Sequence, residues 1–439
     1  MSVASPETGP QSIDRAMELA AAAALAGLGR MTPTRLRNLL AGRSSVDAWA
    51  MTRCGLAADG LMADAEAGDR EGGQAAQWAR EERQAAQLAR EWAQAAQAVE
   101  LAEVWNRYAR AGVRIHLLGR PGYPAVLAGD VQAPPVLFSL GRPEALDRPR
   151  VAVVGTRAAT HYGQEVAAEL GAGLAGAGVV VVSGLALGID GSAHEGALAA
   201  ESGAPPVGVA GNGLDTAYPT SHAQLWRRVA GAGAVLSEAA LGAGPEAWRF
   251  PARNRIIAAL AQVVVVVESH RVGGAMSTVE AAATRGVPVL AVPGSVRSPA
   301  SEGTNALLAE GCGPARDVSD VLVALGLEGP GRDRGADQLG PQVGDGRAGD
   351  PVGRSMAQSQ DLTGADASML TALGWEPTST ESLLRRTGLG LGEAAVILDR
   401  LVEAGRVRDG CGWWEQVSGT PGDRAGHRVG GSRGDQSDR

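Results

Sequence analysis

The sequence contains no lysine, and all 40 of its basic residues are arginine. This absence excludes Schiff-base chemistry on a lysine, covalent attachment of pyridoxal phosphate, and the lysine of a Walker-type phosphate-binding loop. Arginine is therefore the cation that any anionic ligand must meet. Its planar guanidinium group binds phosphates through paired hydrogen bonds and stacks on nucleobases.

Cysteine and long apolar runs are also scarce. The three cysteines, Cys54, Cys312 and Cys411, lie far apart and form no CxxC pair, so neither a disulfide framework nor a metal site is predicted. No apolar run reaches about 18 residues, and the first residues lack a basic region followed by an apolar one. We expect a soluble cytoplasmic protein that has no membrane contact, no metal and no cofactor.

The composition indicates a folded protein whose surface does not attract nucleic acid in general. The sequence of 439 residues is 45% hydrophobic, which can supply a core, whereas aromatic residues make up only 3%. The 62 glycines favour tight turns and close packing of the backbone. Since the net charge is −8, a site for a polyanion must be a local patch on an acidic molecule.

Residues 150–311 alternate short β-branched runs with helical segments. This alternation predicts βαβ units and an α/β fold, a Rossmann-like doubly wound parallel sheet with helices on both faces. The run of five valines within residues 261–268 is typical of a strand that is buried on both faces. The expected strands lie at residues 151–155, 179–184, 206–211, 234–238, 261–268 and 288–294.

Small residues follow each expected strand, at the edge where ligands bind in such sheets. They let backbone amides approach an extended anion. Ser277 and Thr278 lie in the first turn of a helix expected to begin near Met276, and helix N-termini bind phosphate. Arg253 and Arg255 add forked donors just before the valine strand. The small residues at this edge include Gly155, Thr156, Ser183, Gly184, Gly273 and Gly274.

The N-terminal region predicts a helical domain at residues 1–111. A helix ending near Ala26 and a second from Thr32 to Leu40 are joined by a Gly-Leu-Gly turn, which resembles a helix-hairpin-helix (SAM-like) unit and fits an ordinary helical hairpin as well. Residues 56–100 repeat QAAQ, and each ten-residue copy rotates the repeated face by roughly 80° around a helix. We therefore interpret this segment as a solvated insertion that carries no site.

The C-terminal region predicts a linker, a small domain and a tail. Residues 327–360 are rich in glycine and charge, whereas residues 361–417 contain helices and a hairpin expected to turn at Asp409 and Gly410, which resembles a winged helix. Residues 418–439 are expected to be disordered. We favour a protein-contact role for the winged helix, because its expected recognition helix is acidic and would repel phosphate. The helix carries Glu393, Asp399 and Glu403 against Arg400.

Several motifs occur together between residues 112 and 326, the expected sheet domain. They read VVGTRAATHYG at 153–163, SGLALGIDGSAHEGAL at 183–198, GNGLDTAYP at 211–219, FPARNRIIAAL at 250–260 and GGAMSTVEAAATRG at 273–286. In residues and order they resemble the motifs of the DNA-processing protein A family, also called DprA or Smf. The helical and winged-helix flanks are similar to that family as well.

This resemblance implies a non-catalytic homodimer that binds single-stranded DNA, protects it and loads it with the RecA recombinase during natural transformation. By motif position, Arg157 would hold a phosphate, Phe250 would contact a base, and Arg253 and Arg255 would line the DNA pocket. The family usually has SGSL where this chain has GGAM at residues 273–276. The implied DNA-binding set is Gly155, Thr156, Arg157, Ser183, Gly184, Phe250, Arg253, Asn254, Arg255, Gly273, Gly274, Ser277 and Thr278.

The strongest alternative is an enzyme. Residues 273–280 are close to the GGxGTxxE pattern of the phosphoribohydrolases related to lysine-decarboxylase-like proteins, which cleave nucleoside monophosphates with an arginine and that glutamate. Glu280 occupies the acidic position, but Met276 replaces the glycine that lets backbone approach the phosphate. A dinucleotide-dependent oxidoreductase is less favoured, because residues 155–160 lack the GxGxxG pattern.

Two other pairs of titratable residues have both a functional and a structural interpretation. Asp190 and His194 are four residues apart and could bind a metal with a further histidine, although a helix N-terminal aspartate beside a partly buried histidine is favoured. Glu238 and Glu268 could act as acid and base, although pairing with nearby arginines is favoured. His116 alternates with apolar residues and is expected to be a structural histidine.

Overall fold

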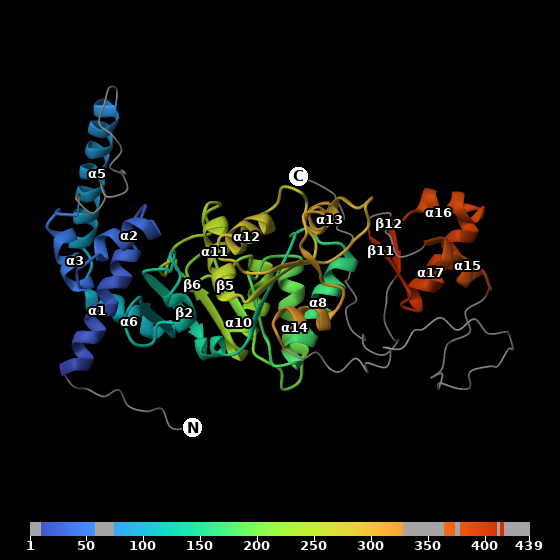
Figure 1. The fold of residues 1–439 in the computed structure, drawn as a ribbon, viewed down its shortest axis with the longest axis horizontal. Helices are drawn as coiled ribbons and strands as arrows, with labels where there is room; N and C mark the ends of the chain where they lie inside the picture. The colour runs from blue at the N-terminus through green and yellow to red at the C-terminus, as the bar shows by residue number, and fades with distance from the viewer. Residues whose placement is uncertain (1–9, 58–73, 328–363, 374–377, 411–412, 417–439) are drawn as a thin grey trace, which may run out of the picture. The chain divides into compact units, whose positions relative to one another are not determined.

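The computed structural model describes residues 10–57, 74–327, 364–373, 378–410 and 413–416 of the 439 (Figure 1). The chain forms two compact units, Met1–Gly335 and Ala336–Arg439. No helix among the described residues combines the length and the apolar character that a membrane crossing requires.

Within the described part of the first unit, nine strands form one sheet in the order β1-β2-β6-β5-β4-β3-β7-β8-β9. The strands from β6 to β9 run parallel, whereas β1 and β2 add an antiparallel edge. The structure thus confirms a mixed α/β fold with a largely parallel sheet. The strands are β1 (Val113–Leu117), β2 (Val136–Gly141), β3 (Arg150–Val154), β4 (Val180–Ser183), β5 (Val207–Ala210), β6 (Ala234–Ser237), β7 (Val263–Val266), β8 (Val289–Ala291) and β9 (Gly313–Pro314).

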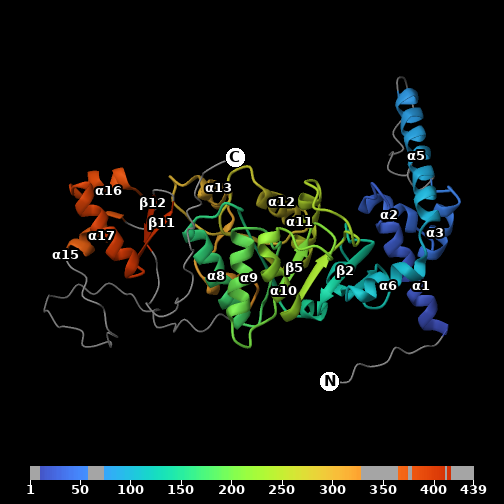
Figure 2. The ribbon, with the colours of Figure 1, turned by 180° about the vertical axis from the view of Figure 1, so that it is seen from behind.

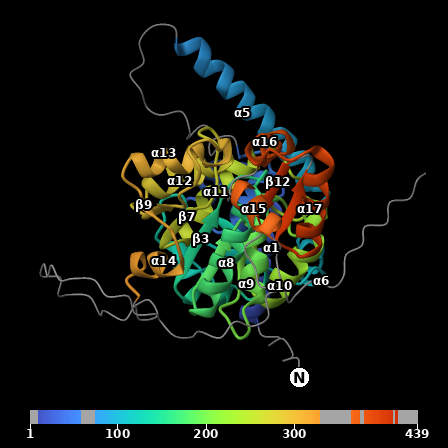
Figure 3. The ribbon, with the colours of Figure 1, turned by 90° about the vertical axis from the view of Figure 1, so that its right-hand side faces the viewer.

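Helices cover both faces of this sheet. Successive side chains of a strand point to opposite sides, so each face of the sheet presents apolar residues to a layer of helices. In β7, Val264 and Val266 pack against α11, whereas Val263 and Val265 pack in a second cluster with α8 and α9. Figure 3 shows α11, α12 and α13 on one side and α8, α9 and α14 on the other; Figure 2 shows α10 beside α9. The helices are α7 (Ala125–Ala128), α8 (His161–Gly176), α9 (Ile189–Ala199), α10 (Ala223–Ala232), α11 (Arg249–Leu260), α12 (Gly274–Ala283), α13 (Glu302–Ala309) and α14 (Val318–Ala324).

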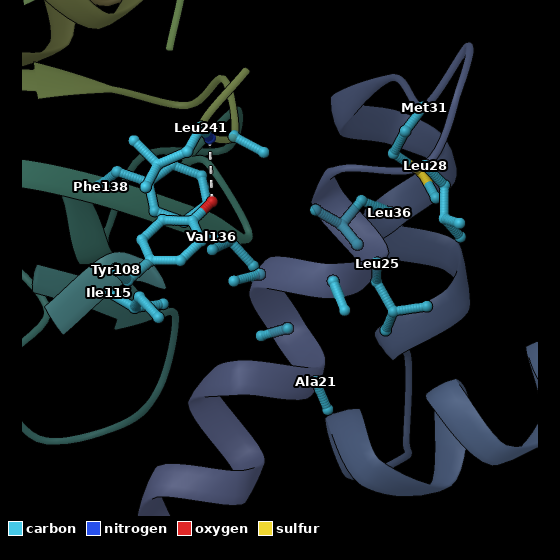
Figure 4. Close-up of a cluster of buried hydrophobic side chains, with 14 of the residues drawn as sticks. Ala21, Leu25, Leu28, Met31, Leu36, Tyr108, Ile115, Val136, Phe138 and Leu241 are labelled. Atoms are coloured by element: carbon cyan, nitrogen blue, oxygen red, sulfur yellow. Dashed lines mark hydrogen bonds between the residues drawn. The ribbon is translucent and has the colours of Figure 1, made fainter. Parts of the chain in front are cut away.

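The N-terminal helices share a buried cluster with the antiparallel edge of the sheet. Figure 4 shows apolar side chains of α1 and α2 facing those of β2. Tyr108 stacks on Phe138 with ring centroids 5.1 Å apart, and its hydroxyl accepts a hydrogen bond from the Leu241 amide at 3.0 Å. Thr32 caps α2 as predicted, since its hydroxyl accepts from the Arg35 amide. These helices are α1 (Pro10–Ala26), α2 (Pro33–Leu40), α3 (Ser45–Arg53), α5 (Gln74–Gln97) and α6 (Leu101–Arg110).

Helix α5 corrects the prediction of a solvated insertion. Its C-terminal half is an amphipathic helix with a buried stripe, and the Trp92 indole donates a hydrogen bond to the Gly29 carbonyl at 2.7 Å. The ten-residue repeat was a poor guide to burial. The side chains that a helix buries recur every three or four residues, and the copies of the repeat differ at those positions. The buried residues of the stripe are Ala85, Leu88, Ala89, Trp92 and Ala96. Residues 58–73 of the expected insertion lie outside the described residues.

The second unit contains helices followed by a small antiparallel sheet in the order β10-β12-β11. Asp409 and Gly410, predicted to form the hairpin turn, instead pair with Trp414 and Trp413 as the end of β11. Most of the residues expected to form the linker and the tail lie outside the described part of the chain. The elements are α15 (Gly364–Leu373), β10 (Thr378–Ser379), α16 (Thr380–Thr387), α17 (Leu391–Glu403), β11 (Val407–Gly410) and β12 (Trp413–Gln416).

Candidate nucleic-acid interface

The connections of two neighbouring strands diverge at the carboxyl edge of the parallel sheet. After β3 the chain enters α8 on one face, and after β7 it enters α12 on the other, which is where ligands bind in open α/β sheets. The Thr156 amide donates to the Glu268 carbonyl at 2.7 Å and closes the base of this crevice. Gly155 is required here, because a Cβ atom would lie 2.5 Å from Cγ1 of Ile189.

An aromatic stack, Arg157–Phe250–Tyr218, lies at this edge and is built from the loops after β3 and β5 and the first turn of α11. The guanidinium carbon of Arg157 is 5.0 Å from the centroid of the Phe250 ring, and the Tyr218 ring centroid is 5.4 Å from that of Phe250. Arg157 is exposed, Phe250 is half-buried, and Tyr218 is 36% exposed. The stack therefore combines accessible aromatic surface with a positive charge held next to it by a cation–π contact.

Tyr218 is a residue of this stack that sequence reasoning missed. It lies in the loop after β5, within the motif at residues 211–219. The signal that could have found it is its residue type, since a tyrosine in a strand-end loop is unusual in a chain with only four tyrosines and two phenylalanines. Its pairing with Phe250 depends on how the loop after β5 meets the first turn of α11, which periodicity does not reveal.

Arg253, predicted to line the DNA pocket, is buried, and its guanidinium group is bound to protein atoms. Its guanidinium group donates to the carbonyls of Gly184, at 2.6 Å, and of Val209, and its Nε donates to Oδ1 of Asn254 at 3.0 Å. Burial lowers the pKa of Arg253 to about 10, while Asp190 opposes this shift. Arg253 therefore holds the ends of β4 and β5 against α11.

Asn254 extends this network to the first turn of α12. Its side-chain amide donates to the Ser277 hydroxyl at 2.7 Å and to the Gly274 carbonyl at 3.0 Å. Gly274 is exposed and Gly273 partly so, which leaves the N-terminal end of α12 open to an anion at the crevice. The network and stack thus bring together many of the predicted residues: Gly155, Thr156, Arg157, Gly184, Phe250, Arg253, Asn254, Gly273, Gly274 and Ser277.

Three predicted DNA-binding residues are directed into the protein instead. Ser183 is buried and its hydroxyl donates to the Val153 carbonyl at 2.6 Å, and Thr278 lies on the buried face of α12. Arg255 forms an ion pair with Glu238, and each of these side chains is 15% exposed. The sequence shows that these residues lie near strand ends, but the direction of each side chain is set by tertiary packing.

The two strand-end glutamates are structural, but only one pairs with arginine. Glu238 binds Arg255 as predicted. The carboxylate of Glu268 instead accepts from the Thr160 amide at 2.9 Å and from the Thr160 hydroxyl at 2.6 Å. Burial is the largest cause that raises the pKa of Glu268. Glu268 thus anchors the loop that carries Arg157, and it does not form an acid–base pair with Glu238.

The histidines have structural surroundings. His116 lies between the Gly122 carbonyl, 2.6 Å from Nδ1, and the Ser139 hydroxyl, 2.7 Å from Nε2, in agreement with its predicted role. Asp190 accepts from the Gly184 amide at 3.1 Å, and His194 is completely buried. Among the described residues, no group of three or more His, Cys, Asp or Glu side chains could hold a metal ion.

Because His194 is buried, we expect the folded protein to lose stability in mild acid. Burial lowers its pKa from 6.5 to about 3, so the unfolded chain takes up a proton at a higher pH than the folded protein does. Stability is full above pH 6.5 and falls as the pH decreases towards 3, by about 1.4 kcal/mol per pH unit. Urea unfolding across this range should show the loss, and His194→Gln should reduce its slope. An identical slope in the variant would contradict this assignment.

The loops after β7 and β8 carry further exposed arginines that sequence reasoning did not single out. Arg271 follows β7 and Arg297 follows β8, while Arg157 follows β3, the neighbour of β7 on its other side. Carboxyl ends of parallel strands meet at one edge, so these guanidinium groups flank the crevice. Exposed arginines thus follow three neighbouring strands, β3, β7 and β8.

Comparisons with known proteins agree on one family. The family model of DNA recombination-mediator protein A matches residues 114–326. Protein Smf of Synechocystis is 32% identical over 306 residues, 65% of this chain and 76% of that protein.

A Mycobacterium tuberculosis relative is 46% identical over 197 residues. The match covers 44% of this chain and 50% of that relative's length. The X-ray structure of DNA processing protein A (DprA) from Streptococcus pneumoniae superposes with a TM-score of 0.54 at 30% identity, over 70% of this chain and 97% of that one. The chain belongs to the DNA recombination-mediator protein A (DprA/Smf) family.

Proposed function

We propose that this protein binds single-stranded DNA at the carboxyl edge of its sheet without cleaving it. The aromatic stack carries the proposal, because it places an exposed guanidinium group against accessible aromatic rings beside a crevice with an open helix N-terminus. Aromatic surface for bases and arginine for phosphates are the two components of single-strand sites that tolerate any sequence.

The proposed biological role is protection of incoming DNA and loading of RecA during natural transformation, by a homodimer in the cytoplasm. Membership of the family supports this role, since its members are named as DNA-processing proteins and as a recombination mediator. Met276 stands where the hydrolase pattern has the glycine that lets backbone approach the phosphate. We therefore propose a binding protein, in preference to a nucleoside-monophosphate hydrolase acting through Glu280.

The same proposal assigns roles to the flanking regions. Residues 1–111 would form a SAM-like helical domain, residues 112–326 a Rossmann-like core, and residues 361–417 a winged helix. The order of α15, α16, α17 and the β11–β12 hairpin supports the last assignment. On α17, Glu393, Asp399 and Glu403 are exposed, so this helix is better suited to a protein partner than to DNA.

Binding of single strands is expected to weaken as salt increases. For a strand that places about three phosphates on the arginine edge, log K should fall with a slope of about −2 against log salt, or about 20-fold between about 50 and 200 mM. Fluorescence anisotropy with single-stranded oligonucleotides measures this slope, with duplex DNA and a mononucleotide as competitors. Salt-independent binding, equal affinity for duplex, or release of ribose 5-phosphate from AMP would contradict the proposal.

A further inference from the structure

Trp248, the last residue before α11, exposes 45% of its surface although it makes several ordered contacts. Its indole Nε1 donates to the Glu246 carboxylate at 2.6 Å, and the guanidinium carbon of Arg249 lies 4.5 Å from its ring centroid. Arg249 in turn binds Glu246 at 3.3 Å. The ring is therefore held in a defined orientation, with apolar surface left open to solvent.

This arrangement repeats the aromatic stack a short distance along the chain. Trp248 with Arg249 and Phe250 with Arg157 are both aromatic rings covered by a guanidinium group, and residues 248 and 250 lie within about 7 Å of each other along the backbone. Gly211 lies near both residues, since it lines one pocket together with Trp248, and a Cβ atom there would be 3.1 Å from the Phe250 ring. The two rings belong to one edge of the sheet.

Exposure of Trp248 is not explained by packing. Elsewhere in the first unit, Trp49, Trp92 and Trp226 are at most 4% exposed and contribute to the hydrophobic cluster that includes the N-terminal helices, whereas Trp105 on α6 is 38% exposed. Trp248 instead borders a pocket whose other walls include Met31 and Pro33 of the α1–α2 region. This pocket extends from Gly211, which lies next to the Phe250 ring, to the N-terminal helices.

We propose that Trp248 is a second base-stacking platform of the DNA site, next to the aromatic stack. The proposal rests on the function proposed above, and it extends that site by at least one nucleotide. A base stacks on the open face of the indole, while Arg249 holds the opposite face and neutralises Glu246, whose carboxylate would otherwise repel the strand. The strand then runs from Phe250 past Trp248 towards the α1–α2 turn.

Two tryptophan variants of the full chain test this platform. Trp248→Ala should lower the affinity for a thymidine oligonucleotide that spans the whole site by about 5- to 150-fold, and Trp248→Phe should restore most of it, because stacking needs only an aromatic face. The matched control is Trp105→Ala, which removes a tryptophan that is 38% exposed on α6. We expect this control to bind as the unchanged protein does.

A second readout separates stacking from a purely structural role. An oligonucleotide with the same phosphates but abasic sugars has no base to stack, so Trp248→Ala should bind it as well as the unchanged protein does. Equal losses on both oligonucleotides, or no rescue by Trp248→Phe, would overturn the platform. The platform would also be overturned if Trp248→Ala bound DNA as the unchanged protein does while Arg157→Ala bound it weakly. That result would leave the proposed function intact. If the unchanged protein binds no single strand, both proposals fail.

Discussion

Arg157→Ala is expected to lower the affinity for single-stranded DNA by about 5- to 150-fold, the equivalent of about 1 to 3 kcal/mol for a charge-assisted contact. Arg157 is exposed at the crevice, and its guanidinium group lies 5.0 Å from the Phe250 ring centroid. Its removal takes away the proposed phosphate ligand and uncovers one side of the aromatic stack. Fluorescence anisotropy with a labelled thymidine oligonucleotide at fixed salt gives the ratio directly.

The control for this variant is Arg110→Ala, which makes the same change of net charge on α6. Arg110 forms a surface ion pair with Glu103, and their side chains are 74% and 73% exposed, so its loss should cost little stability or affinity. Equal affinities for the two variants would place the DNA site away from the aromatic stack. A smaller salt slope in Arg157→Ala than in Arg110→Ala would show that Arg157 meets a phosphate.

The sheet could be predicted from the sequence because parallel strands buried on both faces are continuous apolar runs. All six expected strands of residues 151–294 are present, with β7 inside the predicted run of valines. The glycine after β3 has a local reason too, since a Cβ atom on Gly155 would lie 2.5 Å from the Ile189 side chain and 2.7 Å from the Glu268 carbonyl. These features depend on local composition, so a single sequence contains them.

The role of each arginine could not be predicted in the same way. Arg253 and Arg255 are two residues apart in one helix, yet the first binds main-chain carbonyls and the second binds Glu238. Only the docking of α11 against β4, β5 and the loop before β2 decides this. The sequence also indicates a strand at residues 113–116 and an extended segment at residues 134–138 that lie against the main domain, but the pairing of β2 with β6, a strand distant in sequence, could not be predicted.

Arg253→Ala is expected to destabilise the protein by about 3 to 5 kcal/mol, more than it weakens DNA contacts directly. The guanidinium group is buried and is a donor to the Gly184 and Val209 carbonyls, and it opposes the raised pKa of the buried Asp190. Alanine leaves these acceptors without that donor, each at a cost of about 1 to 3 kcal/mol. Urea unfolding followed by circular dichroism measures the difference.

The variant Arg253→Lys separates the contribution of the forked guanidinium hydrogen bonds from that of the positive charge. Lysine keeps a cation near Asp190, but its single nitrogen cannot reproduce the bonds to the Gly184 carbonyl and to Asn254 together. Its stability should therefore lie between those of the unchanged protein and Arg253→Ala. DNA affinity, measured where each variant remains folded, should fall less for Arg253→Lys than for Arg157→Ala. If Arg253→Ala instead has the same free energy of unfolding as the unchanged protein but no longer binds DNA, then Arg253 must leave its carbonyl partners and contact the strand itself.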